Sequence, residues 1–210
     1  MKFNCILFDL DGTLINTNEL ILQSFRHVIK LNQGREFSSE EITQHFGEPL
    51  TTILERLAPG TGTQLVPAYL EFNQAKHDEL TAAFPGTRET LSALKALGIT
   101  LGVVTSKMKH MAHRGLQLFK LEEYFSVIVA WEDCANHKPE GEPVLKALEI
   151  LEHKPEGVLY VGDSTIDIQC AQHAGVKSAA VMWSSLSRDR LLASGPDFLL
   201  QNMGELLDLV

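Results

Sequence analysis

The chain has 210 residues, of which 44% are hydrophobic and 21% are charged. This composition is typical of a folded globular protein and excludes a chain that is mainly disordered. The 27 acidic residues outnumber the 18 Lys and Arg, which gives a formal net charge of -9 and argues against nucleic acid as a partner. The 3 cysteines are widely spaced and form no CxxC motif, so we expect reduced thiols and neither a disulfide framework nor a zinc site.

No part of the sequence has the pattern of a membrane or export segment. The longest apolar runs stay well below the ~18 residues that a membrane-spanning helix needs. The apolar run before Asp9 is too short for a signal peptide. We therefore expect no membrane partner and a cytoplasmic location.

Short apolar runs recur along the chain between polar residues or glycine. Such runs are typical of strands that are buried on both faces of a sheet. They lie at Cys5–Phe8, Ile99–Val104, Val127–Val129, Val158–Val161, Ala179–Met182 and Phe198–Leu200.

Helical patterns separate these runs. Thr87 is the expected N-cap of a helix that ends before Gly98, and Pro143 is expected at the first position of another. A further helix is predicted to end at Gly175. Strands that alternate with helices predict an α/β fold with a doubly wound parallel (Rossmann-like) sheet.

One segment, residues 16–82, departs from this alternation. It has helical patterns and no convincing strand, and Ser38 with Glu41 forms the signature of a capping box. A third helical region in this segment is predicted over Leu65–Leu80. We therefore predict a core made of residues 1–15 and 83–210, with an all-helical domain of residues 16–82 inserted after the first strand.

Polar residues follow four of the predicted strands. They are Asp9, Asp11, Gly12 and Thr13 after the first, Thr105, Ser106 and Lys107 after the second, Lys138 after the third, and Asp163 and Asp167 after the fourth. Open parallel sheets bind ligands at the carboxyl ends of their strands, so we expect these side chains at one edge. Two carboxylates ~4 Å apart repel by roughly 4 kcal/mol at an effective dielectric constant of ~20. The four aspartates carry more negative charge than Lys138 alone offsets. We therefore predict a divalent cation with oxygen ligands, most naturally Mg²⁺.

This set of motifs resembles the haloacid dehalogenase superfamily of phosphohydrolases. Asp9-x-Asp11-Gly12-Thr13, Thr105, Lys138 and Gly162-Asp163-Ser164-x-x-Asp167 match its four motifs in order. The helical insert lies where the type-one cap domain of the family belongs. The resemblance implies hydrolysis of a small anionic phosphate compound with Mg²⁺.

The resemblance also implies a role for each motif residue. Asp9 would attack phosphorus and form an aspartyl-phosphate, and Asp11 would protonate the leaving oxygen and then activate water. Thr105 and Lys138 would hold the phosphoryl group. The predicted metal residues are Asp9 and Asp163 through their side chains, Asp11 through its backbone carbonyl, and Asp167 in support through water or Lys138. The predicted substrate-binding residues are Gly12, Thr13, Ser106 and Lys107.

Within the superfamily, the acid/base Asp11 argues against a dehalogenase, whereas a sugar-phosphate mutase stays possible. Residues 9–20, the segments 72–73 and 77–80, and the run 103–107 are similar to bacterial inorganic pyrophosphatases. Those enzymes remove the pyrophosphate formed when seryl-phosphorylated HPr is dephosphorylated. The catalytic motifs do not separate this group from phosphoglycolate phosphatases, which remain the alternative.

The second phosphate of pyrophosphate would need a cation to hold it. The candidates are Lys107 at the active face and Arg26, Arg35, Arg56 and Lys76 in the helical segment. A non-catalytic phospho-acceptor or sensor is the alternative from a different class, because receiver-type domains also combine acidic clusters with Mg²⁺. Such domains place paired acids on the first strand and the acceptor on a later strand, which differs from this chain.

Overall fold

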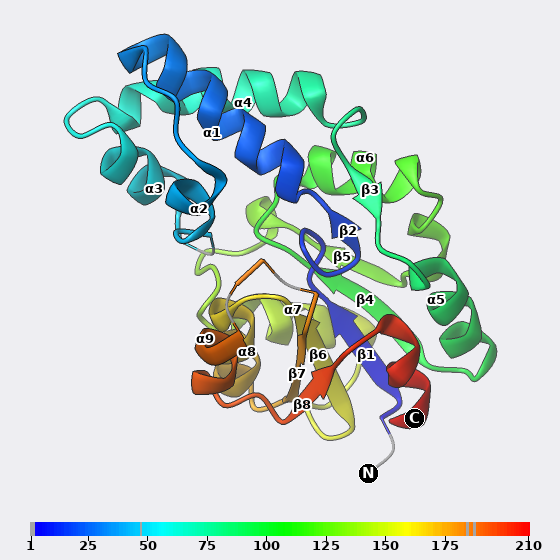
Figure 1. The fold of residues 1–210 in the computed structure, drawn as a ribbon. Helices are drawn as coiled ribbons and strands as arrows, with labels where there is room; N and C mark the ends of the chain where they lie inside the picture. The colour runs from blue at the N-terminus through cyan, green and yellow to red at the C-terminus, as the bar shows by residue number, and fades with distance from the viewer. Residues whose placement is uncertain (1–2, 47, 184, 187) are drawn as a thin grey trace. The chain divides into compact units, whose positions relative to one another are not determined.

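The structure is a computed structural model that describes residues 3–46, 48–183, 185–186 and 188–210 (Figure 1). The chain forms two compact units. The sheet unit contains the residues up to Asn16 and those from Ala83 onward, and the helical unit is Thr17–Ala82.

Six parallel strands form the sheet, in the order β5-β4-β1-β6-β7-β8. They are β1 (Cys5–Phe8), β4 (Thr100–Val104), β5 (Val127–Val129), β6 (Val158–Gly162), β7 (Lys177–Val181) and β8 (Phe198–Leu200). All six predicted strands are confirmed, although β7 begins two residues before the predicted Ala179. Phe8 of β1 lies opposite Val103 of β4 on one side and Val161 of β6 on the other. The strand order therefore changes direction at β1, which is where open parallel sheets bind ligands.

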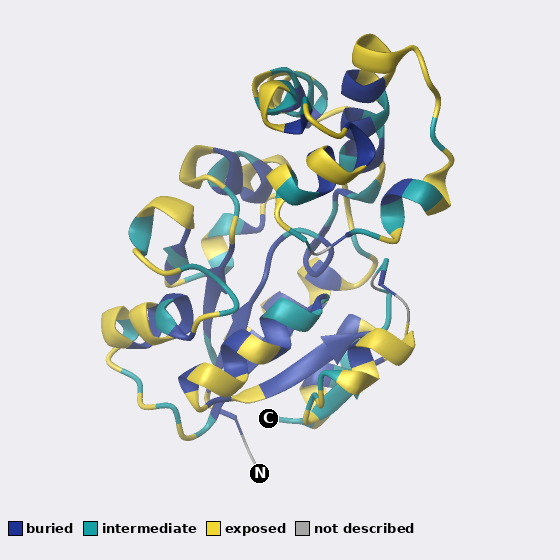
Figure 2. Cartoon of the chain, turned by 90° about the vertical axis from the view of Figure 1, so that its left-hand side faces the viewer, coloured by how far each residue is buried: buried dark blue, intermediate teal, exposed yellow. Residues whose placement is uncertain are grey.

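Helices cover both faces of the sheet because successive strand residues point to opposite sides. Ile6 and Phe8 pack in a core with α5 (Thr87–Ala96), α6 (Lys109–Leu118) and the 3₁₀ helix η3 (Met203–Asp208). Cys5 and Leu7 pack in a second core with α7 (Glu142–Leu151) and α8 (Thr165–Ala174). In Figure 2 the strands of the sheet are buried and the helices expose their outer faces. The predicted doubly wound α/β fold is confirmed.

The helix ends of the sheet unit differ from the predictions in two places. Gly86, with a φ of 78°, is the N-cap of α5, and Thr87 is the first helical residue. The Thr87 hydroxyl donates to the carbonyl of Leu14 at 3.4 Å instead of capping its own helix, which explains the error. Pro143 is the second residue of α7, a place where its missing N–H would have had no helical partner in any case. The predicted helix end at Gly175 is confirmed.

The helical unit contains α1 (Asn18–Gln33), α2 (Ser39–Thr43), α3 (Leu50–Leu57) and α4 (Gly62–Lys76). The rings of Phe25 on α1 and Tyr69 on α4 lie 4.8 Å apart between their centroids. The predicted capping box is present: Ser38 Oγ accepts from the Glu41 N–H at 3.2 Å, and Glu41 Oε2 accepts from the Ser38 N–H at 2.8 Å. These bonds satisfy N–H groups that a helix start would otherwise leave without partners.

Two short strands were not predicted. β2 (Ile15–Asn16) and β3 (Ala82–Ala83) pair with each other in a two-stranded sheet, where the chain leaves the sheet unit and returns to it. Strands of two residues are too short to show an alternating pattern, so the prediction of no strand near these positions was wrong. Among the described residues, no helix is long and apolar enough to cross a membrane.

The remaining elements of the sheet unit are α9 (Arg188–Ala193) and the 3₁₀ helices η1 (Glu122–Tyr124) and η2 (Trp131–Asp133). Asp197 joins β7 to the start of β8. Its carboxylate accepts from Lys177 Nζ at 2.5 Å, from the Ser178 N–H at 2.9 Å and from Ser178 Oγ at 3.2 Å. Partial burial would raise the pKa of Asp197, but the bonds from Lys177 and Ser178 outweigh it and hold the pKa below its ordinary value.

We expect Asp197→Asn to lower the free energy of unfolding by about 1–2 kcal/mol at pH 7, because the substitution weakens bonds to a charged acceptor. A carboxyl whose pKa is lowered by folding stabilises the fold above its unfolded pKa, and this contribution is lost as the pH falls through the folded pKa. The difference between the two proteins should therefore shrink at pH 3. Urea unfolding at both pH values measures it, with Asp208→Asn on the exposed end of η3 as the control. An equal effect at both pH values would contradict this account.

Candidate active site

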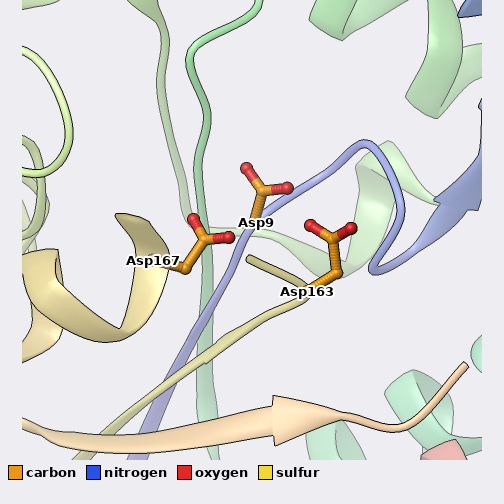
Figure 3. A group of neighbouring side chains, drawn as sticks. All are labelled: Asp9, Asp163 and Asp167. Atoms are coloured by element: carbon orange, nitrogen blue, oxygen red, sulfur yellow. The ribbon is translucent and has the colours of Figure 1, made fainter. Parts of the chain in front are cut away.

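Three carboxylates meet at the carboxyl edge of the sheet, next to β1. Asp9 follows β1 directly, Asp163 follows β6 directly, and Asp167 lies in the first turn of α8. One oxygen of each lies within 4.8 Å of one oxygen of the others. Figure 3 shows the three side chains gathered around one space, each coming from a different stretch of backbone. The predicted acidic residues of the first and fourth motifs are therefore brought together, apart from the Asp11 side chain.

Lys138 bridges two of these carboxylates. Its Nζ donates to Asp9 Oδ1 at 2.6 Å and to Asp167 Oδ1 at 2.7 Å, and its side chain is only 3% exposed. Burial favours the neutral amine, but Asp167 and Asp9 outweigh it and raise the pKa of Lys138 above its ordinary value. The lysine is therefore an ammonium group that neutralises part of the acidic charge.

Four donors from the described residues hold the Asp167 carboxylate. Its Oδ1 accepts from Lys138 and, at 3.2 Å, from the Tyr160 hydroxyl. Its Oδ2 accepts from the Ser164 N–H at 3.1 Å and from Ser164 Oγ at 2.5 Å, in the capping box that begins α8. A carboxylate has about four lone-pair sites, so this set of bonds fits a support role through Lys138 better than a direct metal bond.

The Asp11 carboxylate is not one of the three clustered carboxylates, and it pairs with Lys107. Lys107 Nζ donates to Asp11 Oδ1 at 2.7 Å, and the two side chains are 11% and 29% exposed. The Lys107 N–H donates to Thr105 Oγ1 at 3.1 Å. The Lys107–Asp11 ion pair therefore connects the loop after β4 to the loop after β1. This ion pair was not predicted from the sequence.

Two glycines make room for the cluster. Gly12 has a φ of 81°, and a Cβ atom there would lie 2.3 Å from Asp163 Oδ2. A Cβ atom on Gly162 would lie 2.3 Å from the Cβ of Asp167. Any side chain at either position would therefore displace a carboxylate of the site.

The other predicted site residues differ in burial. Thr105 is buried at the end of β4, where its N–H donates to Val129 O at 2.9 Å. Thr13 is fully buried, and its carbonyl accepts from Trp183 Nε1 at 3.2 Å. Ser106, in contrast, is exposed. Thr13 therefore belongs to the interior of the loop, whereas Ser106 lies at its surface.

The electrostatics of the cluster indicate a shortage of positive charge. Burial and the neighbouring carboxylates Asp167 and Asp11 raise the pKa of Asp9 to about 7, despite the opposing effect of Lys138. Burial, Asp167 and Asp9 also raise the pKa of Asp163 well above its ordinary value. A hard dication with oxygen ligands would relieve both effects, so these residues fit Mg²⁺.

The family model for haloacid dehalogenase-like hydrolases matches residues 6–181. The chain therefore belongs to this family. Together with its identity of about 40% to pyrophosphatases, this makes it a phosphohydrolase, of a class that acts on small phosphate compounds.

Individual relatives are similar over the whole chain. The chain is 41% identical to the pyrophosphatase PpaX of Bacillus cereus and 39% identical to the pyrophosphatase PpaX of Anoxybacillus flavithermus. Each comparison covers 100% of this chain, with 97% of the first relative and 98% of the second. A crystal structure described as a predicted phosphoglycolate phosphatase from Haemophilus somnus has a TM-score of 0.87 and 24% identity, and the match covers 99% of this chain and 98% of that one. That structural likeness shows the shared fold.

We expect Mg²⁺ to stabilise the protein, and more strongly at pH 8 than at pH 5. A carboxyl whose pKa is raised by folding stabilises the fold below its unfolded pKa, and this contribution is lost as the pH rises through the folded pKa. The cation-free protein should therefore lose stability as the pH rises from about 4 to 7. Above this range, Mg²⁺ would supply the stabilisation that protonation supplies at low pH.

At a hundredfold excess over its dissociation constant, Mg²⁺ should raise the melting temperature at pH 8 by about 5–10 °C. Thermal unfolding with and without Mg²⁺ measures this, and Asp163→Asn should remove most of the increase while Asp208→Asn keeps it. A shift that is equal at both pH values, or unchanged in Asp163→Asn, would contradict the assignment of the cation to this cluster.

Proposed function

We propose that this phosphohydrolase is Mg²⁺-dependent, acts through an aspartyl-phosphate on Asp9, and hydrolyses inorganic pyrophosphate to phosphate. Asp9 supports this proposal most directly. It is buried at the end of the central strand β1, and Lys138 holds its Oδ1 at 2.6 Å. The second oxygen, Oδ2, is then the atom that attacks phosphorus.

The reaction needs two steps. In the first, Asp9 Oδ2 bonds to phosphorus, the bond from phosphorus to the bridging oxygen breaks, and Asp11 gives its proton to the leaving phosphate. In the second, Asp11 takes a proton from water, which attacks phosphorus and releases phosphate and free Asp9. The partly exposed carboxylate of Asp11 suits a group that must exchange protons with both the leaving oxygen and water.

Charge stabilisation is the other requirement of phosphoryl transfer. Asp9 and Asp163, with the backbone carbonyl of Asp11, would hold the Mg²⁺, which supplies positive charge for the phosphoryl oxygens. Lys138 keeps Asp9 oriented and adds a buried positive charge beside it. Thr105, at the end of the neighbouring strand, would donate a hydrogen bond to the transferring group.

The substrate is the finer part of the proposal. It is supported by the identity of about 40% to pyrophosphatases along the whole chain. The helical unit is proposed as the type-one cap domain of the family, the part on which specificity depends. Phosphoglycolate hydrolysis is the alternative, because the same fold occurs in a structure described as a predicted phosphoglycolate phosphatase.

We expect rapid Mg²⁺-dependent phosphate release from pyrophosphate and a much slower release from 2-phosphoglycolate. Asp9→Asn should reduce the rate at least about a thousandfold, because it removes the nucleophile. Parallel steady-state assays of both substrates measure this. A preference for 2-phosphoglycolate would keep the mechanism and overturn the substrate. A protein without turnover that keeps a stable phosphate on Asp9 would instead be a phospho-acceptor.

Lys107 is the cation proposed to hold the second phosphate of pyrophosphate. It lies beside Asp11, the residue that would protonate the oxygen between the two phosphates. The partner of Lys107 is thus a residue of the proposed reaction, whereas the four cationic candidates of the helical unit contact other residues of that unit: Arg26 donates to Ser39 Oγ, Arg35 pairs with Glu41, Arg56 with Glu48 and Lys76 with Glu79.

Lys107→Met should therefore raise the KM for pyrophosphate about tenfold or more, because it removes a charge-assisted hydrogen bond to substrate. The KM for phenyl phosphate, which has no second anionic group, should change by less than about twofold. Lys109→Met is the matched control, since Lys109 lies two residues further on and pairs with Asp133. Equal changes in KM for both substrates would exclude this role for Lys107.

A further inference from the structure

We propose that Tyr160 is a positioning residue whose buried hydroxyl orients Asp167 and, through it, Lys138 and the nucleophile Asp9. The proposal rests on the proposed roles of Asp9 and Lys138. Tyr160 contacts neither the transferring phosphoryl group nor the Mg²⁺ in this scheme, and it acts only through the residues that do.

Tyr160 lies in the strand that leads to the site. It lies in β6, two residues before Gly162, and is 0% exposed. Its side chain packs with Leu7 on the face that α7 and α8 cover. Asp9 follows two residues after Leu7, so the alternation of strand side chains directs Asp9 to the same side of the sheet as Tyr160.

The hydroxyl connects two parts of the site. Its single proton is shared between two acceptors, Val104 O at 2.9 Å and Asp167 Oδ1 at 3.2 Å. Val104 directly precedes Thr105, so a single hydroxyl links the end of β4 to the carboxylate at the start of α8. Burial, Asp167 and Asp9 raise the pKa of Tyr160 well above its ordinary value, so the group stays a neutral phenol with a proton to donate.

The ring of Tyr160 also faces the lysine. Lys138 Nζ lies 5.4 Å from the ring centroid, a distance at which an aromatic face attracts an ammonium group. Asp167 Oδ1 accepts from both Tyr160 and Lys138, so the two donors fix the position of the same oxygen. Lys138 in turn fixes Asp9 Oδ1.

A purely structural role accounts less well for this hydroxyl. The neighbours of Tyr160 in β6 are the apolar Val158, Leu159 and Val161, and all are fully buried. Phenylalanine would fill the same space without the cost of burying a hydroxyl group. Within the described part of the chain, the hydrogen bonds of the hydroxyl go to Asp167 and to the carbonyl before Thr105, both at the edge of the sheet that carries the site.

The test is Tyr160→Phe, which keeps the ring and removes the hydroxyl. We expect kcat for pyrophosphate to fall about tenfold while KM stays within about twofold, because Tyr160 acts on the catalytic groups and not on substrate binding. Tyr124→Phe is the matched control, since that hydroxyl accepts from Arg88 at 3.4 Å on η1 and should leave kcat unchanged.

A double-mutant cycle separates positioning from a general loss of stability. Lys138→Arg keeps the charge but changes the geometry on which Tyr160 acts. In that background, Tyr160→Phe should change kcat by less than about twofold, because coupled residues give non-additive effects. All rates are measured well below the midpoint of thermal unfolding of each variant and are expressed per folded protein, so a less stable variant still yields an answer.

Three results would overturn the proposal: an unchanged kcat in Tyr160→Phe, a fall that is equally large in the Lys138→Arg background, or a rise in KM that accounts for the whole effect. The proposed function fails separately, through full activity of Asp9→Asn. Inactive Asp9→Asn together with additive effects of Tyr160→Phe would overturn only the positioning role.

Discussion

The bridge that Lys138 forms between Asp9 and Asp167 is the interaction on which the site depends. Two carboxylates about 4 Å apart repel by roughly 4 kcal/mol at an effective dielectric constant of ~20, and burial adds a desolvation cost. The lysine, itself buried, offsets this repulsion for the two carboxylates that it contacts. The pKa values of Asp9 and Asp163 nevertheless stay raised. Burial and the presence of three carboxylates beside one ammonium group therefore make a site that fits a cation.

The strand order of the sheet brings the residues of the site together. β1 is flanked by β4 and β6, so the residues after three adjacent strands come to one edge of the sheet. Gly12 and Gly162 supply the remaining space, because a Cβ atom at either would displace Asp163 or Asp167. The acidic cluster thus depends as much on the two missing side chains as on the carboxylates. Asp11, the acid/base candidate, pairs with Lys107, and its carboxylate is partly exposed.

The strands could be predicted from the sequence, because buried parallel strands leave continuous apolar runs. The meeting of Asp9, Lys138, Asp163 and Asp167 at one edge could be predicted too, because the motif residues follow these strands, whereas their catalytic and metal-binding roles stay predictions. β2 and β3 could not, since two residues carry no periodicity. The N-cap at Thr87 was wrong because the partner of its hydroxyl, Leu14 O, is distant in the sequence. Tyr160 was counted only as part of an apolar run. Its role needs the Asp167 carboxylate, which α8 brings to it across the sheet edge, and the only signal was a hydroxyl group just before Gly162-Asp163.

Asp163 and Asp167 lie four residues apart, yet their surroundings separate their chemistry. Asp167 lies in the first turn of α8, where a negative charge is favoured, and its two oxygens accept from Ser164, Lys138 and Tyr160. Asp163 lies before the helix, and burial with nearby carboxylates raises its pKa. A cation would therefore gain more at Asp163, whereas Asp167 accepts from the lysine. Since each donor on Asp167 lessens its competition for the cation, the Tyr160 hydroxyl helps to keep these two roles apart.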